Sequence, residues 1–284
     1  MMEQALATRH YPALADRLWG IVPAGTCLRR RWRFLLPGRR PFNPAPLSSV
    51  LDRAGALFSA DRLVAVLARG HEHDASGLDG VRRVVQPAYR GSAAEVFLPL
   101  LAIVRRDPQA IVAVLPPDAA GQDEPWFLAT VETAAAAVAS RPDLPLVIGL
   151  APPCTRPSGW VQPGDLVAGL KRFGVRSVRR FIRRPSFAEA AAIHAGGGLA
   201  STGVIVAQAE TLLDLGRRNL PDVLETLEPL EHALGAPEES LLCEAVYEAM
   251  PYANLSHALF VADEPVGILA IPRMRARVRP VASA

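Results

Sequence analysis

An aspartate that follows a short apolar run is the clearest candidate for chemistry in this sequence. The run Ile111–Leu115 is typical of a buried strand, and Asp118 comes after it in LPPD. A carboxylate suits a hard cation such as Mg²⁺, and open parallel sheets bind ligands at the carboxyl ends of their strands. The alternative is an exposed loop aspartate that caps the next helix. Its place at the strand end favours Asp118 as a metal ligand.

Arginines gather in two clusters, Arg29–Arg33 and Arg176–Arg184. The chain has 31 Lys and Arg against 28 Asp and Glu, a net charge of +3. This weak excess fits binding of phosphate-bearing small molecules and does not demand nucleic acid. A solvated basic face explains such clusters equally well. We therefore expect small anionic ligands, and neither a nucleic acid nor a membrane as partner.

Histidines and cysteines indicate no second site. His71 and His73 form an H-x-H in a polar stretch that favours a surface turn. Cys27, Cys154 and Cys243 are far apart and show no C-x-x-C spacing, which is typical of a reducing cytoplasm. Charges stand where a signal peptide has its apolar core, and the apolar runs are shorter than the ~20 residues of a membrane span. These features predict a cytoplasmic protein.

Short apolar runs alternate with amphipathic stretches along the chain. Their near-continuous apolarity is typical of parallel strands covered on both faces, so we expect an α/β domain with an open, mainly parallel sheet flanked by helices. This domain is assigned to residues 17–284 after an N-terminal extension, 1–16, and Ala151–Gly164 is expected to be a long loop. The expected strands are Leu18–Val22, Leu63–Leu67, Ile111–Leu115, Leu146–Leu150, Val178–Ile182 and Gly203–Ala207, and the tail has a strand-like Gly267–Ile271. The expected helices are Ala45–Phe58, Ser92–Arg106, Pro125–Ser140, Ser186–Ala195, Ala209–Arg218 and Glu238–Met250.

Five segments, in order and at similar intervals, resemble motifs of the sugar-phosphate nucleotidyltransferases. They are QPAYRGSAAEVFLPLLAI (Gln86–Ile103), IVAVLPPDAAGQDEPWF (Ile111–Phe127), GWVQPG (Gly159–Gly164), FIRRPS (Phe181–Ser186) and ASTGVIV (Ala200–Val206). The nearest group is the bacterial mannose-1-phosphate guanylyltransferases, and the resemblance covers most of the chain from Leu18 to about Pro229. It implies a Rossmann-like, glycosyltransferase-A-type fold. The implied reaction joins a nucleoside triphosphate and a sugar 1-phosphate into a nucleotide sugar, with release of pyrophosphate.

The resemblance also implies which residues meet the nucleotide. One set opens the phosphate-binding loop, and a second set lies beside the base and ribose, although an ordinary turn with a helix cap at Ser92 explains that second stretch equally well. Two arginines stand in for the cationic residues of the catalytic loop, and an aspartate holds Mg²⁺, the implied cofactor. GTP is the favoured nucleotide. By this resemblance, Ala24 and Gly25 open the phosphate-binding loop, and Gln86, Arg90, Gly91 and Ser92 lie beside the base and ribose. Arg29 and Arg33 are the two arginines, and Asp118 is the Mg²⁺ ligand.

At the sugar end the resemblance implies contacts from Gln162, Arg184 and Ser201. An amide and a hydroxyl can bond sugar hydroxyl groups, and a guanidinium can bind the phosphate. We expect the segments Val22–Arg33, Gln86–Ser92 and Gly159–Gly164 to line one cleft, where the sugar 1-phosphate meets the nucleotide.

Several family positions are changed. The loop G-x-G-T-R is absent, Cys27 stands where its arginine is expected, and no second metal aspartate follows Gly267–Ile271. Such losses remove amide donors and positive charge around the phosphates, so weak activity is expected. The alternatives are a nucleotidyltransferase and a non-catalytic relative that binds a nucleotide, a sugar phosphate or a protein. A third, weaker alternative, a glycosyltransferase, would normally carry a D-x-D motif, and none is evident.

Overall fold

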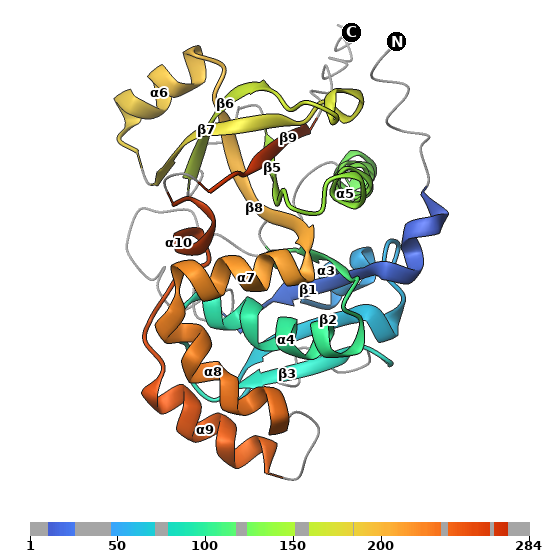
Figure 1. Cartoon of the computed structure of the whole chain (residues 1–284), viewed down its shortest axis with the longest axis vertical. Coiled ribbons are helices and arrows are strands. Elements are labelled where there is room, and N and C mark those ends of the chain that lie inside the picture. The colour runs from blue at the N-terminus through green and yellow to red at the C-terminus, as the bar shows by residue number, and fades with distance from the viewer. Residues whose placement is uncertain are drawn as a thin grey trace, which may run out of the picture.

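The computed structural model describes residues 11–25, 47–71, 79–117, 124–150, 159–183, 185–233, 238–261 and 264–271. Within these residues nine strands form one sheet, in the order β3-β2-β1-β4-β8-β5-β9-β7-β6. The first four strands and the last five make two halves, one above the other in Figure 1. The two halves are built differently.

The parallel half contains β1 (Leu18–Pro23), β2 (Leu63–Ala68), β3 (Arg82–Gln86) and β4 (Ile111–Val114). All three of its strand pairings, β1–β2, β1–β4 and β2–β3, are parallel. The apolar side chains of β1, β2 and β4 are buried because helices cover both faces. The expected parallel α/β arrangement is confirmed here.

The closed half corrects the expectation of an open sheet. Strand β8 (Leu199–Gln208) runs antiparallel to β4 and β5 (Leu146–Leu150), and β5 pairs in parallel with β9 (Gly267–Ile271). From β9 the pairing continues through β7 (Arg176–Arg183) and β6 (Gly159–Leu166), and β6 returns to β8. These five strands therefore close on themselves, and most of their pairings are antiparallel.

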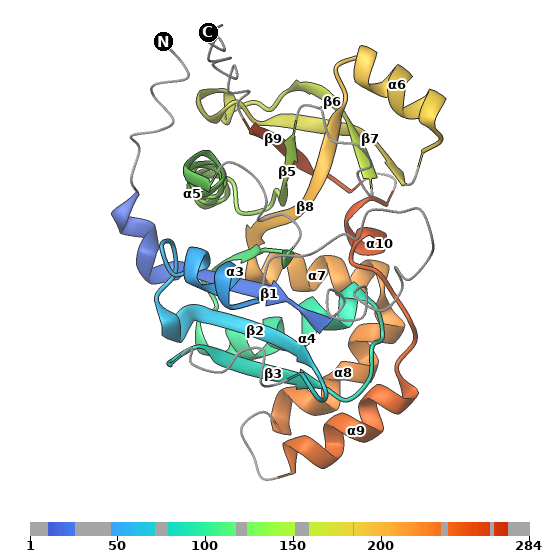
Figure 2. The same cartoon turned by 180° about the vertical axis from the view of Figure 1, so that it is seen from behind.

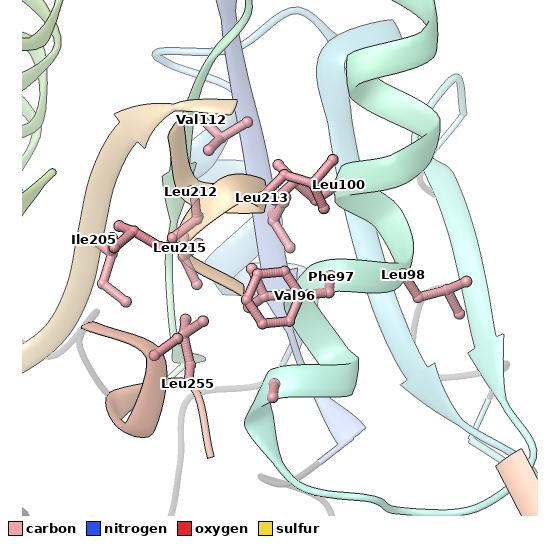
Figure 3. Packing of buried hydrophobic residues seen from close by; sticks show 14 of the residues in the cluster. Val96, Phe97, Leu98, Leu100, Val112, Ile205, Leu212, Leu213, Leu215 and Leu255 are labelled. Atoms are coloured by element: carbon pink, nitrogen blue, oxygen red, sulfur yellow. The ribbon is translucent and has the colours of Figure 1, made fainter. Parts of the chain in front are cut away.

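Two apolar layers cover the sheet because alternate side chains of each strand point to opposite faces. Helices α4 (Ser92–Arg106), α7 (Ala209–Asn219) and α8 (Pro221–Ala233) pack on one face. Helices α3 (Leu47–Ala54) and α5 (Glu124–Ser140) pack on the other, and α3 lies in front of β1 in Figure 2. Figure 3 shows side chains of α4 and α7 packed together, among them Val96, Phe97, Leu100, Leu212, Leu213 and Leu215, with Leu255 beside them.

The other described helices are short or peripheral. Helix α6 (Phe187–Ala195) begins with a capping box in which Ser186 and Glu189 bond each other's backbone N–H, as expected for a start at Ser186. Helix α9 (Glu239–Ala249) lies beside α8, and α10 (Ser256–Leu259) lies between the two halves in Figure 1. Three 3-10 turns complete the set: Pro12–Arg17, Ala60–Arg62 and Lys171–Phe173.

Most of the expected elements are confirmed, with differences of a few residues at their ends. Strand β3 was not expected because its residues, RRVVQ, lie at the sheet edge with mostly exposed side chains. Residues 159–164 of the expected loop Ala151–Gly164 belong to β6, where Pro163 lies at an irregularity in the pairing with β7. Helix α8 was also missed. Across the described chain, no helix is long and apolar enough to span a membrane.

Candidate nucleotide-binding site

The carboxyl end of the parallel half brings together two segments that the sequence marked for nucleotide binding. Ala24 follows β1 directly, and its N–H donates to Val66 O at 2.8 Å, which fixes the chain between β1 and β2. Gly25 comes next and is buried. Gln86 is the last residue of β3 and is only 2% exposed. Parallel strands end at the same edge of a sheet, so Gly25 and Gln86 meet although 61 positions separate them.

Gly25 faces two side-chain oxygens at close range. A Cβ on Gly25 would lie 2.7 Å from Glu95 Oε1 and 3.2 Å from Gln86 Oε1. Glu95 belongs to the first turn of α4 and is 1% exposed. Only a residue without a side chain leaves both oxygens in place, so Gly25 is needed for close approach.

Glu95 was not singled out from the sequence. The available signal was an acidic residue among the apolar side chains of SAAEVFLPLLAI, where a solvated helix face was not expected. A carboxylate in the first turn of a helix is favoured by the helix dipole, although its burial is costly without partners. Glu95 places negative charge beside the point where the expected phosphate-binding loop begins.

The amide of Gln86 is fixed by a residue from the far end of the chain. Its Nε2 donates to the hydroxyl of Tyr247 at 2.7 Å, and Tyr247, on α9, is 1% exposed. Burial raises the pKa of Tyr247 far above its ordinary value, and the nearby Cys243 and Glu95 raise it further. The hydroxyl therefore stays protonated and neutral at every physiological pH.

Arg90 anchors the turn that follows β3. Its guanidinium donates from Nε to Tyr247 O at 2.6 Å and from Nη2 to Glu248 O at 3.0 Å, at the end of α9. These carbonyls belong to the last turn of the helix, which lacks partners within the helix, so a cation there is favoured. In this arrangement Arg90 supports the turn from within the protein.

Gly91 and Ser92 are held by the segment that leads from α9 to α10. Gly91 has φ 93°, and a Cβ there would lie 2.0 Å from Ala253 O. Ser92 Oγ accepts from the N–H of Leu255 at 3.0 Å. Two backbone bonds join the same chains, from Ala93 N to Ala253 O and from Ala253 N to Arg90 O, each 3.1 Å. Gly91, rather than Ser92, is the N-cap of α4.

At the sugar end the expected residues make lighter contacts. Gln162 on β6 donates from Nε2 to Gly196 O at 3.1 Å. Ser201 on β8 accepts at Oγ from Gly203 N at 3.3 Å, within an irregular stretch of the strand where Gly203 has φ 79°. Both side chains are only partly buried. Because each is held by one bond to a local carbonyl or N–H, both polar groups can reorient toward a ligand.

A chain of contacts through α10 connects the two halves. Leu255, bonded to Ser92, is the N-cap of α10, and Phe260 at its other end stacks on Phe181 of β7 with ring centroids 3.9 Å apart. Arg183 on β7 contacts His257 Nε2 on α10. A Cβ on Gly159 would touch the same Phe181 ring, at 2.5 Å. Thus Gln86–Ser92 and Gly159–Gly164 are linked through α10, while their cleft with Val22–Arg33 stays a prediction.

Four of the expected site residues lie outside the described residues: Arg29, Arg33, Asp118 and Arg184. Strand β4 ends at Val114, four positions before Asp118. Among the residues that the structure describes, no group of three or more His, Cys, Asp or Glu could hold a metal ion.

Comparison with known proteins identifies the fold. No family model matches the sequence, and no curated protein matches it. A crystal structure of mannose-1-phosphate geranyltransferase from Thermus thermophilus matches with a TM-score of 0.69 and 24% identity, over 90% of this chain and 74% of that one. Mannose-6-phosphate isomerase from Helicobacter pylori matches with a TM-score of 0.67 and 16% identity, over 90% and 97%. The chain shares the fold of these two proteins. The shared α/β fold includes both the parallel strands and the closed strands, since the matches extend over nine tenths of the chain.

Proposed function

We propose that the protein binds a nucleoside triphosphate, with GTP favoured, at the carboxyl end of its parallel strands. The observation that carries this proposal is the meeting of Gly25 and Gln86 at that edge, with the Gln86 amide fixed by Tyr247. Ligands bind at this edge in open α/β sheets, and a fixed amide can pair with a base edge. The fold shared with two proteins named for mannose phosphates supports the same proposal.

The proposed reaction is nucleotidyl transfer to a sugar 1-phosphate, as in the mannose-1-phosphate guanylyltransferases. An oxygen of the sugar phosphate attacks the α-phosphorus, the bond to the β-phosphate breaks, and pyrophosphate leaves. Fixed positive charge around the phosphates would stabilise this transfer, and Arg29 and Arg33 are the proposed donors. Gln162, Ser201 and Arg184 are the proposed sugar-phosphate contacts. The described part of the chain gathers no carboxylate cluster, so Mg²⁺ as cofactor rests on Asp118 alone.

Two observations favour the alternative of a binding protein with little or no turnover. Glu95 sets a carboxylate against Gly25, where the loop that should hold phosphates begins. Arg90 donates to two backbone carbonyls of α9, so these donors are already used within the protein. Removing one preorganised donor costs 10²–10³ in rate in other enzymes, about 3 kcal/mol. Combined with the lost glycines and arginine, this predicts turnover far below an ordinary enzyme rate.

Pyrophosphate release tests the reaction directly. Purified protein is incubated with Mg²⁺, each common nucleoside triphosphate and each common sugar 1-phosphate, while ligand-induced thermal shifts report binding without chemistry. We expect a thermal shift with GTP and slow release that Asp118→Asn abolishes. Binding without release supports the non-catalytic alternative. No shift with any nucleotide or sugar phosphate contradicts the proposed function.

A further inference from the structure

The side chain of Gln86 is oriented by α9, an element that neither the sequence motifs nor the fold comparison connects with the nucleotide. Gln86 and Tyr247 lie 161 residues apart, and both are almost fully buried. With Nε2 donating to the tyrosine hydroxyl, the amide oxygen of Gln86 is the group left on the side of Gly25. The binding edge therefore presents an acceptor at this point.

Burial makes that orientation costly to change. A buried amide that loses its partner must leave a polar group unpaired, since water does not reach it. The Tyr247 hydroxyl accepts this bond at 2.7 Å, so the amide nitrogen of Gln86 is satisfied on the side of α9. The bond to Tyr247 therefore keeps the amide oxygen of Gln86 toward the edge.

The backbone of Tyr247 is fixed as well as its side chain. Arg90 donates to the carbonyl of Tyr247 and to that of Glu248, while Ala253 and Leu255 bond the chain around Gly91. We call Tyr247–Leu255 the clamp segment. Gln86 and Arg90 stand at the two ends of the turn that follows β3, and both bond to Tyr247, one to its hydroxyl and the other to its carbonyl. A shift of α9 would therefore move both ends of that turn.

We infer that Tyr247 is a positioning residue that sets nucleobase selectivity by holding the Gln86 amide in one orientation. The inference rests on the proposed nucleotide binding and adds the residue that controls its specificity. A base that offers an N–H donor to the Gln86 oxygen is accepted. A base with an acceptor at that place is rejected, because the two acceptors repel and turning the amide would break the bond from Gln86 Nε2 to Tyr247.

The decisive variant is Tyr247→Phe, which removes the hydroxyl and keeps the ring in the core. Dissociation constants for GTP, ATP, CTP and UTP are measured by calorimetry for the wild type and the variant. We expect the ratio between the tightest and the weakest nucleotide to fall about tenfold, the effect of one hydrogen bond. Tyr252→Phe is the matched control: Tyr252 lies in the same clamp segment but is 62% exposed, so its loss should leave the ratio unchanged.

A second measurement follows Gln86 without nucleotide. The side-chain NH₂ of Gln86, assigned with Gln86→Ala, should exchange slowly with solvent in the wild type and faster in Tyr247→Phe, while thermal unfolding shows that the variant is folded. If Tyr247→Phe leaves the ratio of the dissociation constants unchanged, whether or not all four nucleotides bind more weakly, the inference is overturned and the proposed function stays intact. A wild type that binds none of them overturns both, even if the NH₂ exchange confirms the hydrogen bond.

Discussion

The parallel half and the closed half hold their expected ligand-binding residues in opposite ways. Gly25, Gln86 and Gly91 are buried and are braced by groups from distant parts of the chain. Gln162 and Ser201 are partly exposed, and each makes one bond to a backbone group. The proposed nucleotide end is thus held in place by the fold itself, whereas the side chains of the proposed sugar end are free to adjust to a ligand. Changes at the first end should reduce stability, and changes at the second should affect only binding.

The largest effect is expected for Gly91→Ala. Its φ of 93° strains any L side chain, and the added Cβ would lie 2.0 Å from Ala253 O, so the clamp segment must move. We expect a loss of about 3 kcal/mol or more in the free energy of unfolding, measured by urea denaturation. Gly70→Ala is the matched control, since Gly70 has φ 82° with nothing within 4 Å of its Cβ position. It should lose only about 1 kcal/mol, and equal losses at the two glycines would contradict a clamp.

A smaller effect is expected for Gly25→Ala, because its new Cβ meets a side chain and no backbone. The Cβ would lie 2.7 Å from Glu95 Oε1, so we expect a loss of about 2 kcal/mol. Glu95→Ala removes that oxygen, and the double variant should therefore be more stable than the sum of the two single losses by about 1 kcal/mol. Denaturation of all four proteins tests this. Strict additivity would mean that Glu95 does not limit the space at Gly25.

At the sugar end, Gln162→Ala and Ser201→Ala should leave stability unchanged within about 0.5 kcal/mol, since both side chains are partly exposed and singly bonded. If the proposed function holds, the same variants weaken sugar 1-phosphate binding while GTP binding stays constant. Calorimetry with each ligand separates these effects. A large loss of stability in either variant would remove the contrast between the two halves.

The difference between buried and partly exposed elements also explains which parts of the structure the sequence could predict. Strands β1, β2, β4 and β5 are continuous apolar runs, a pattern that depends only on burial, and all were foreseen. Ring closure was not foreseen, because it depends on pairings such as Trp160 with Ala200 between strands that are partly exposed or contain proline. At the site, motif residues could be listed from the sequence. Tyr247 could not, since its role arises from a contact with a residue 161 positions away. For Glu95 the only signal was its place among apolar residues, which says nothing of its contact with Gly25.

Cys243 gives a chemical probe of α9, the helix that carries Tyr247. It lies one turn before Tyr247 on α9, and burial raises the pKa of its thiol to about 11 from 9.0, with Glu239 adding to the rise. Only the thiolate is alkylated, so at pH 8 the reaction should run about a hundredfold slower than for a free thiol. The raised pKa also means that the rate keeps climbing about tenfold per pH unit to near pH 11. Iodoacetamide labelling in a Cys27→Ser, Cys154→Ser background measures this by mass spectrometry. An alkylation rate that levels off near pH 9 would mean that α9 often leaves its packed position. The proposed nucleotide end would then be no more rigid than the proposed sugar end.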